Sequence, residues 1–408
     1  MPDHVTAADD QVAAPRAVPR DHYVAHARLG AVPQATAQTA IERDLRRADV
    51  RPGEAVLEIG TGTGLTGALL AELAGPSGRV VSVDIDPALI RRARELHAER
   101  NVRNITLVTG DGNKGAPGYG PFDVIIAWAT PAVIPRAWLN QARPGTRICT
   151  PVYFAETARS SAHVCATVTT SGGLADITLG TASYVDMGGQ INTSFKVPMF
   201  YIDAVRDCRG EPTWISVAWR GRHVGHDPRR ALEILAEPGY REPWTLAPGM
   251  AGLRQAWRDF RAYCAARDHG SNLTSHGTAD GDNAIGFSSG NNAAVLTDSG
   301  TILANAAASP ALAKLRDRLE DWDDARRPGL ADLMPTTVDR QDGAAVRLTL
   351  PAVLGAVHVF SLGIHRKVYY ARYLLLSPGT GVPVSAGTGM ECELADDAEW
   401  RPACREPI

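Results

Sequence analysis

Three glycines at alternating positions, Gly60, Gly62 and Gly64, follow the apolar stretch AVLEI and precede a leucine-rich stretch. Glycine adopts positive φ angles at little cost, and without a side chain it lets the backbone approach a ligand closely. Between a strand and a helix, such a loop is typical of nucleotide-cofactor sites. Glu58 and Thr61 belong to the same segment, and we expect all five residues to contribute to a cofactor site.

Acidic residues end the next two apolar stretches along the chain. Asp84 follows RVVSV, and Asp111 with Gly112 follows ITLVTG. Because the carboxyl ends of parallel strands meet at one edge of a sheet, these residues should lie near the glycine loop. Asp84 can accept hydrogen bonds from both hydroxyls of a ribose, and Asp111 and Gly112 fall where an adenine lies in this architecture. The pattern predicts a nucleoside-binding cleft.

The spacing favours S-adenosylmethionine (SAM) over a dinucleotide. Dinucleotide sites prefer G-x-G-x-x-G, whereas this loop reads GTGTG, and no GxxxxGK[ST] is present, which excludes a P-loop. The Glu58 carboxylate, two positions before Gly60, suits a cationic sulfonium and would repel a pyrophosphate. The alternative is that the glycines serve only tight strand–helix packing, but the matching acidic strand ends argue against it.

The surrounding sequence predicts the elements that position these residues. Apolar runs at 55–59, 79–84, 105–109, 122–128 and 147–152 are interpreted as strands, with helices beginning near Gly64 and after Asp86-Pro87. This alternation predicts a Rossmann-like α/β sheet, that of a class I SAM-dependent methyltransferase, with a mixed α+β C-terminal extension. In the extension we expect antiparallel strands over 153–220, helices over 228–268, a flexible loop at 276–283, a hairpin with a DSG turn at 286–305, a helix at 309–327 and β-like sequence at 345–376.

These patterns divide the chain into four parts. We expect a flexible arm at 1–17, the SAM-binding domain at 18–152, a peptide-recognition region at 153–350 and a segment of undetermined role at 351–408.

Composition excludes several function classes. Lys and Arg total 42 against 45 Asp and Glu, so no strong field attracts nucleic acid or an anionic membrane. No run of 18 apolar residues and no signal sequence are present, which favours a cytoplasmic protein without a membrane span. The six cysteines form no CxxC pair, so we expect reduced thiols and no disulfide. The pair His223 and His226 lacks a third ligand, and no metal site is predicted. The oligomeric state is not determined by the sequence.

Six segments together resemble the protein-L-isoaspartate O-methyltransferases: VPRDHYV (18–24), VLEIGTGTG (56–64), VSVDIDP (81–87), VTGDGNKG (108–115), FDVIIAWATPAVIP (122–135) and LNQARPGTRICTPV (139–152). The resemblance implies that the glycine loop with Glu58, together with Asp84, Asp111 and Gly112, lines a SAM site. The family also carries a Q-T-I-S-x-P-like stretch beside the methyl-transfer site. Here the corresponding residues include Gln34, Thr36 and Thr39, which we expect to hold the acceptor carboxylate, the alternative being an ordinary helix surface.

The extension more loosely resembles that of methyltransferases encoded with ribosomally made, modified peptides such as lanthipeptides, graspetides and lasso peptides. The resembling segments are 286–305 and 315–335. The resemblance implies methylation of an aspartate of a modified ribosomal peptide, followed by closure of the ester to an aspartimide, which can hydrolyse to isoaspartate. Two alternatives stay open: an isoaspartate repair methyltransferase with an extra domain, and a SAM-binding protein without turnover.

Overall fold

The computed structural model describes residues 18–351, apart from gaps at 33–34, 190–195, 209, 222–225, 247–251, 269–272 and 279, together with four short strands beyond residue 368. The chain divides into two compact units, Met1–Leu350 and Pro351–Ile408. The expected arm at 1–17 lies outside the described residues. In the second unit, the described strands are β20 (Tyr369–Tyr370), β21 (Leu374–Leu376), β22 (Pro383–Ala386) and β23 (Glu391–Cys392).

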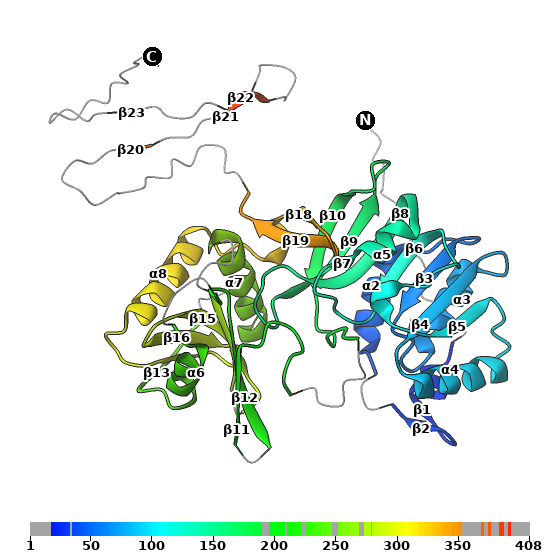
Figure 1. The fold of residues 1–408 in the computed structure, drawn as a ribbon, viewed down its shortest axis with the longest axis horizontal. Helices are drawn as coiled ribbons and strands as arrows, with labels where there is room; N and C mark the ends of the chain where they lie inside the picture. Colours follow the sequence, from blue (N-terminus) through cyan, green and yellow to red (C-terminus); the bar gives the residue numbers. More distant parts are fainter. Residues whose placement is uncertain are drawn as a thin grey trace, which may run out of the picture. The chain divides into compact units, whose positions relative to one another are not determined.

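A seven-stranded sheet in the order β10-β9-β8-β6-β3-β4-β5 carries the glycine loop (Figure 1). Its parallel part is β3 (Ala55–Ile59), β4 (Arg79–Asp84), β5 (Ile105–Thr109), β6 (Phe122–Ala127) and β8 (Ala142–Tyr153), which confirms the predicted strands. This is the class I SAM-dependent methyltransferase fold. The strands β9 (Ser161–Val168) and β10 (Leu174–Thr181) extend the sheet in antiparallel fashion. The expected boundary at 152 falls inside β8, and the sheet continues beyond it to β10.

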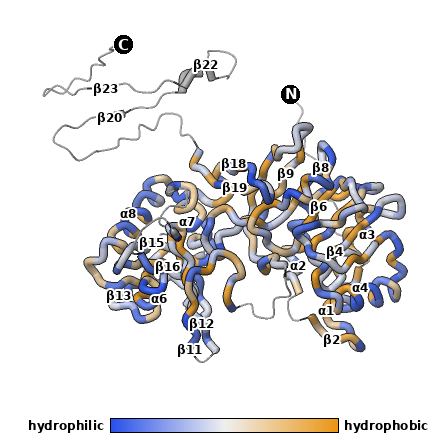
Figure 2. Tube along the Cα trace, in the orientation of Figure 1, coloured by the Kyte–Doolittle hydropathy of each residue, from blue (hydrophilic) through white to orange (hydrophobic). Residues whose placement is uncertain are grey.

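Helices cover both faces of this sheet. α2 (Gln38–Ala48), α3 (Leu65–Ala74) and α4 (Pro87–Glu99) belong to the first part of the chain, and α5 (Arg136–Asn140) follows β6 and the short β7 (Ile134–Pro135). Asp86 caps α4 as expected, because its side chain accepts a 2.7 Å hydrogen bond from the backbone N–H of Ala88. α1 (Arg20–Val24) and the small hairpin of β1 (Ala25–His26) and β2 (Gly30–Ala31) precede α2. Hydrophilic residues gather on outer helices such as α4 (Figure 2).

A second seven-stranded sheet, entirely antiparallel, forms the predicted α+β extension. Its order is β11-β12-β14-β15-β16-β17-β13, built from β11 (Ala204–Cys208), β12 (Glu211–Val217), β13 (Tyr240–Pro243), β14 (Leu273–Gly277), β15 (Asn283–Ser289), β16 (Asn292–Thr297) and β17 (Thr301–Ala304). α7 (Leu253–Asp268) and α8 (Pro310–Asp324) pack on one face, and α6 (Pro228–Ala236) packs on the other.

Two details of the extension differ from expectation. The DSG turn joins β16 to β17, so the predicted hairpin at 286–305 is part of a three-stranded meander. The predicted loop at 276–283 is mostly a turn between paired strands, with His276 opposite Ala284. Register between neighbouring strands, which short sequence windows do not contain, accounts for both differences.

The extension also completes the core of the first sheet. β18 (Met334–Arg340) pairs with β19 (Gly343–Thr349), and β19 pairs with β7. Ala344 and Val346 of β19 join the apolar cluster that contains Leu57 and Trp138. The two parts of Met1–Leu350 therefore share one core rather than sitting on a simple linker. Among the described residues, no helix has the length and apolar character needed to cross a bilayer.

Candidate functional site

A cavity of about 390 Å³ opens at the carboxyl ends of β3 and β4. Its lining includes Gly60, Thr61, Gly62, Asp84 and Gly112, five of the residues predicted to bind the cofactor. The volume is within the range of small-molecule sites. The strand order reverses between β4 and β6 around β3, and ligands of open α/β sheets bind at such a switch point.

The glycine loop needs its glycines for backbone reasons. Gly60, Gly62 and Gly64 have φ angles of 95°, 50° and 87°, in a region that side chains other than glycine rarely adopt. Gly64 is the N-cap of α3 and lies outside the cavity lining. At Gly60 and Gly62 the loop therefore presents backbone groups, not side chains, to whatever occupies the cavity.

Asp84, at the end of the neighbouring strand β4, is hydrogen-bonded to the glycine loop. Its Oδ2 accepts a 2.9 Å hydrogen bond from the backbone N–H of Gly62, and its Oδ1 accepts one of 2.9 Å from Asp86. Burial raises the pKa of Asp84 above its ordinary value, while these two backbone donors act in the opposite direction. A carboxylate has about four acceptor positions, more than these backbone donors use, so it can still accept from a ligand hydroxyl. The residue therefore fits the ribose of SAM.

Gly112, the last residue of the GDG segment, forms part of another wall of the cavity. Asp111 caps a short 3-10 helix (Gly112–Lys114) through a 2.9 Å bond from the N–H of Asn113, and it lies outside the cavity lining. Trp138, which is fully buried, donates from Nε1 to the carbonyl of Gly112 at 2.7 Å. A Cβ on Gly112 would lie 2.7 Å from Cγ2 of Ile59, so a side chain there would displace the wall.

Glu58 lies beneath the loop rather than in the cavity. The side chain is 0% exposed, and it accepts hydrogen bonds from Ser82 at 2.5 Å and from Trp128 Nε1 at 3.0 Å. Burial raises its pKa to about 7. Glu58 is therefore not among the residues that line the cavity, and its expected part in the SAM site stays a prediction. Every residue of β3 is buried, and the orientation of Glu58 could not be deduced from an exposed face.

The residues expected to hold the acceptor carboxylate are dispersed. Gln34 lies outside the described residues. Thr36 lines the cavity, and its carbonyl accepts a 2.8 Å hydrogen bond from Arg20, which also lines the cavity and was not predicted. Thr39 is exposed on α2 and lies outside the lining, which agrees with the helix-surface alternative.

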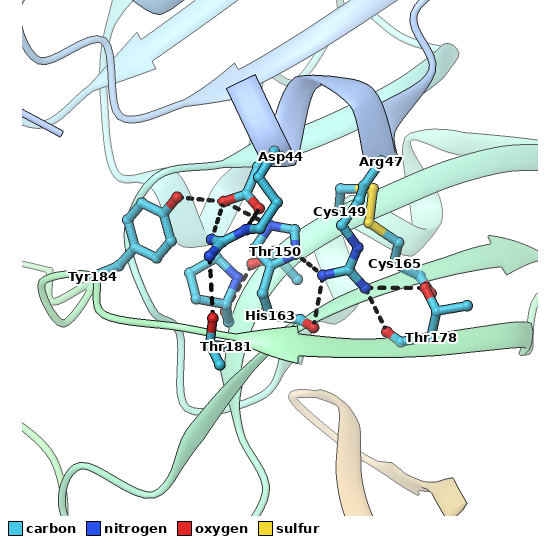
Figure 3. A network of polar contacts seen from close by, with 11 residues as sticks. Asp44, Arg47, Cys149, Thr150, His163, Cys165, Thr178, Thr181 and Tyr184 are labelled. Atoms are coloured by element: carbon cyan, nitrogen blue, oxygen red, sulfur yellow. Dashed lines mark hydrogen bonds and ion pairs between the residues drawn. A yellow bond between two sulfur atoms is a disulfide. The ribbon is translucent and has the colours of Figure 1, made fainter. Parts of the chain in front are cut away.

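The segment from Val185 to Gly188 also lines the cavity and was missed, because it is about 120 residues from the glycine loop in sequence. A buried polar network anchors it (Figure 3). The hydroxyl of Tyr184 donates to Asp44 of α2, and Arg43 donates to the same carboxylate at 2.7 Å. No local pattern could have indicated this arrangement.

The same network includes a buried histidine. Arg47 donates to Nδ1 of His163 at 2.8 Å, and Nε2 of His163 lies 3.5 Å from Oδ2 of Asp44. Burial lowers the pKa of His163 to about 4, so the ring is neutral at pH 7. Arg47 also reaches the carbonyl of Thr178 at 3.0 Å. Together these bonds tie α2 to β9 and β10, next to the segment that lines the cavity.

A disulfide joins Cys149 of β8 to Cys165 of β9 beside this network (Figure 3). The two residues are direct partners in the antiparallel register, with Cα atoms 4.2 Å apart. The expectation of no disulfide is wrong here, because the pairing depends on strand register and not on cysteine spacing.

Among the described residues, the structure brings together one group of side chains that could hold a metal ion, His22, His26 and Glu99, whose ligand atoms lie within 4.8 Å of one another. His26 Nε2 lies 3.2 Å from Glu99, and Arg28 pairs with the same carboxylate at 3.0 Å. These bonds hold the hairpin of β1 and β2 against the end of α4. His223 of the considered pair lies outside the described residues.

Known proteins match the first part of the chain. The family model described as Protein-L-isoaspartate(D-aspartate) O-methyltransferase matches residues 4–167. A Protein-L-isoaspartate O-methyltransferase of Ignicoccus hospitalis is 38% identical over 124 residues, which are 30% of this chain and 59% of that protein. A protein of the same name from Methanoculleus marisnigri is 38% identical over 142 residues, which are 35% of this chain and 61% of that protein. The chain thus covers about three fifths of the length of these relatives.

Solved structures are more distant. One is a putative protein-L-isoaspartate O-methyltransferase from Plasmodium falciparum in complex with S-adenosyl-L-homocysteine. The match covers 42% of this chain and 87% of the Plasmodium chain, with 14% identity and a TM-score of 0.35. A likeness this low supports no conclusion about the site. The family model thus matches residues 4–167, less than half of the chain, and this region has the class I SAM-dependent methyltransferase fold, whose cofactor is SAM.

Proposed function

We propose that this protein is a SAM-dependent O-methyltransferase that esterifies a side-chain carboxylate of a protein or peptide. The observation that carries the proposal is the cavity at the ends of β3 and β4, formed by the glycine loop, Asp84 and Gly112 within the region that matches the family. The matched relatives bear the name of an isoaspartate O-methyltransferase, and the activity is transferred to this chain on that basis.

The residues that would hold the cofactor follow from the cavity. The backbone of Gly60 and Gly62 and the carboxylate of Asp84 would bind the polar parts of SAM, and Gly112 would leave room for the adenine. Glu58 and Asp111 would act indirectly, Glu58 by supporting the loop through Ser82 and Trp128, and Asp111 by capping the turn at Gly112. SAM would supply an electrophilic methyl group on its sulfonium.

The protein's remaining task is to bind and orient the acceptor. A carboxylate is ionised at pH 7 because its reference pKa is about 4, so no general base is required. The rate of methyl transfer then depends on placing the carboxylate in line with the sulfonium methyl group and on excluding water. The hydroxyl of Thr36, held near the cavity by the bond from Arg20 to its backbone, is the candidate donor to the acceptor carboxylate.

Two more specific classes of substrate are compatible with this activity. The family match favours an isoaspartyl residue in a damaged protein, as in repair. The second sheet, which lies beyond the region matched by the family model, favours a selected aspartate of a modified ribosomal peptide, with the methyl ester closing to an aspartimide or continuing to isoaspartate. Selecting one aspartate in one peptide requires additional contact surface, and added surface can both attract the correct partner and exclude others.

One mass-spectrometric experiment separates these substrates. The protein is incubated with SAM and either an isoaspartyl test peptide or the modified peptide encoded beside its gene. Repair predicts a mass gain of one methylene on the first peptide. The biosynthetic role predicts the same gain on the second, followed by a net loss of one water relative to the starting peptide. Mass changes on neither peptide would contradict both and leave a SAM-binding protein without turnover. An Asp84→Ala variant, which should lose cofactor binding, serves as the inactive control.

A further inference from the structure

A second cavity, of about 230 Å³, lies on the other side of the segment that lines the SAM cavity. Val185 and Asp186 line both cavities, so the same stretch of backbone borders each of them. The opposite wall of the second cavity comes from α7 of the extension. The polar network around Asp44 and Tyr184 anchors the shared segment (Figure 3). The two cavities are therefore neighbours.

Three arginines line this second cavity: Arg159 after β8, and Arg258 and Arg261 on α7. The carboxylates that share it are already engaged. Asp186 accepts hydrogen bonds from the Tyr153 hydroxyl at 2.7 Å and from the N–H of Met199 at 2.8 Å. Asp298, 3.7 Å from Arg254, accepts from the N–H of Asn283 at 3.2 Å. The lining therefore contains three guanidinium groups against two carboxylates.

Arg261 is the buried member of the three. It is 7% exposed, its guanidinium lies 4.8 Å from the ring centre of Trp257 and 5.7 Å from that of Phe154, and Nη1 donates to the carbonyl of Arg159. Its Nε has no hydrogen-bond partner, and among the described residues no carboxylate forms an ion pair with it, although the charge of Asp298 acts favourably on it from farther away. Burial, followed by the charge of Arg258, lowers the pKa of Arg261 to about 9, which still leaves it protonated at pH 7.

Such an arrangement is costly for the free protein. A buried cation without a counter-ion loses hydration that the protein does not replace, and a second cation nearby adds repulsion. Arg258 is half-buried and makes no ion pair within the described part of the chain. Arg159 is held with a φ of 63°, a conformation that non-glycine residues adopt rarely and that is enriched at functional sites. An anionic ligand would offset both the missing counter-ion and the repulsion.

We propose that this arginine cavity binds an acidic residue of the acceptor peptide, so that the substrate carries a second carboxylate close to the one that is methylated. The inference rests on the proposed function and defines its substrate class as acidic peptides. Guanidinium groups bind carboxylates through paired, charge-assisted hydrogen bonds. An extended chain advances about 3.3 Å per residue, so neighbouring residues of one peptide can occupy two adjacent cavities.

The test uses two isoaspartyl peptides of equal length, one with glutamate and one with glutamine on both sides of the isoaspartate. Calorimetry on the full-length protein measures their affinities in the presence of S-adenosylhomocysteine, and the methylation rate gives kcat and KM for each. We expect the glutamate peptide to bind about tenfold more tightly, as charge-assisted hydrogen bonds imply. The difference should shrink at high salt. Equal affinities for the two peptides would overturn the proposal.

Substitutions on α7 test whether Arg258 is responsible for the preference for the glutamate peptide. Arg258→Gln, at a half-buried position, should remove most of the preference by raising KM for the glutamate peptide alone. Arg258→Glu should reverse the preference toward a peptide with lysine in the flanking positions. Arg267→Gln, on the same helix but outside the cavity lining, is the matched control and should change neither peptide. Equal losses in Arg258→Gln and Arg267→Gln would contradict a specific site.

The same experiments test the methyltransferase activity and the arginine cavity independently of each other. If the glutamate peptide binds through Arg258 but neither peptide is methylated, the methyltransferase proposal falls and the anion site stands. If both peptides are methylated with equal KM, the methyltransferase proposal stands and the anion site falls. SAM affinity, measured in every variant, should remain unchanged, because none of these positions lines the SAM cavity. A parallel loss of SAM affinity in Arg258→Gln would assign the residue to folding and overturn the proposal.

Discussion

Replacing Glu58 by glutamine removes a titratable group from the interior beneath the glycine loop. The carboxyl is fully buried, and its pKa is about 7 against an ordinary value of 4.5. A carboxyl whose pKa is raised in the folded state takes up a proton on folding. Its contribution to stability is therefore fully present below pH 4.5 and is lost as the pH rises through 7.

The size of this loss follows from the shift. One pKa unit corresponds to about 1.4 kcal/mol, so a shift from 4.5 to about 7 corresponds to about 3 kcal/mol in the free energy of unfolding. Glutamine keeps an oxygen acceptor for the Trp128 N–H, and its amide can donate to the Ser82 hydroxyl, so both hydrogen bonds survive. Glu58→Gln should therefore match the wild type near pH 4.5 and exceed it by about 3 kcal/mol near pH 8.5.

Urea unfolding at intervals between these pH values, followed by circular dichroism, measures the difference. Glu72→Gln, at an exposed position on α3, is the control, and its difference from wild type should not vary in this way with pH. A stability difference between Glu58→Gln and wild type that stays constant across the range would refute the reasoning, because it would show that Glu58 does not change its protonation on folding.

Three further predictions concern the cofactor, the disulfide and metals. Asp84→Ala should weaken SAM binding at least about tenfold, since it removes charge-assisted hydrogen bonds to the ribose; unchanged affinity in a folded variant, measured by calorimetry, would contradict this role. Reduction of Cys149–Cys165, which closes a loop with a sequence separation of 16, should lower the free energy of unfolding by about 3 kcal/mol, and urea curves identical with and without reductant would show that the bond is not formed. Exhaustive dialysis against EDTA should leave methyl transfer intact, because a carboxylate nucleophile needs neither a Lewis acid nor activated water. If zinc restored lost activity, His22, His26 and Glu99 would be the first residues to substitute.

Sequence alone was sufficient for the parts of the fold that depend on neighbouring residues. The five parallel strands, the cap of α4 by Asp86 and the glycine loop after β3 follow from apolar periodicity, turn chemistry and the conformational freedom of glycine. The location of Asp84 at the carboxyl end of β4 follows as well, because parallel strands bring their ends to one edge. These features need only a window of a few residues around each position.

Tertiary structure decided which side chains face the cavity. Glu58 and Gly60 are two residues apart, yet Glu58 is held beneath the loop by Ser82 and Trp128 while Gly60 lines the cavity. Because β3 is buried along its whole length, no alternation of polar and apolar residues marks its faces. The orientation of Glu58 depends on packing against β4 and β6, which its local sequence does not contain.

The other features of the site depend on contacts between segments that are distant in sequence. The Cys149–Cys165 bond, the segment at Val185 beside the SAM cavity, and the meeting of Arg159 with Arg261 of α7 each join residues that are distant in sequence. Local propensities constrain each segment separately, whereas the pairing between segments is selected by the burial of shared apolar surface. That selection acts on the whole folded chain, and for this reason the cofactor loop could be predicted from the sequence while the arginine cavity required the structure.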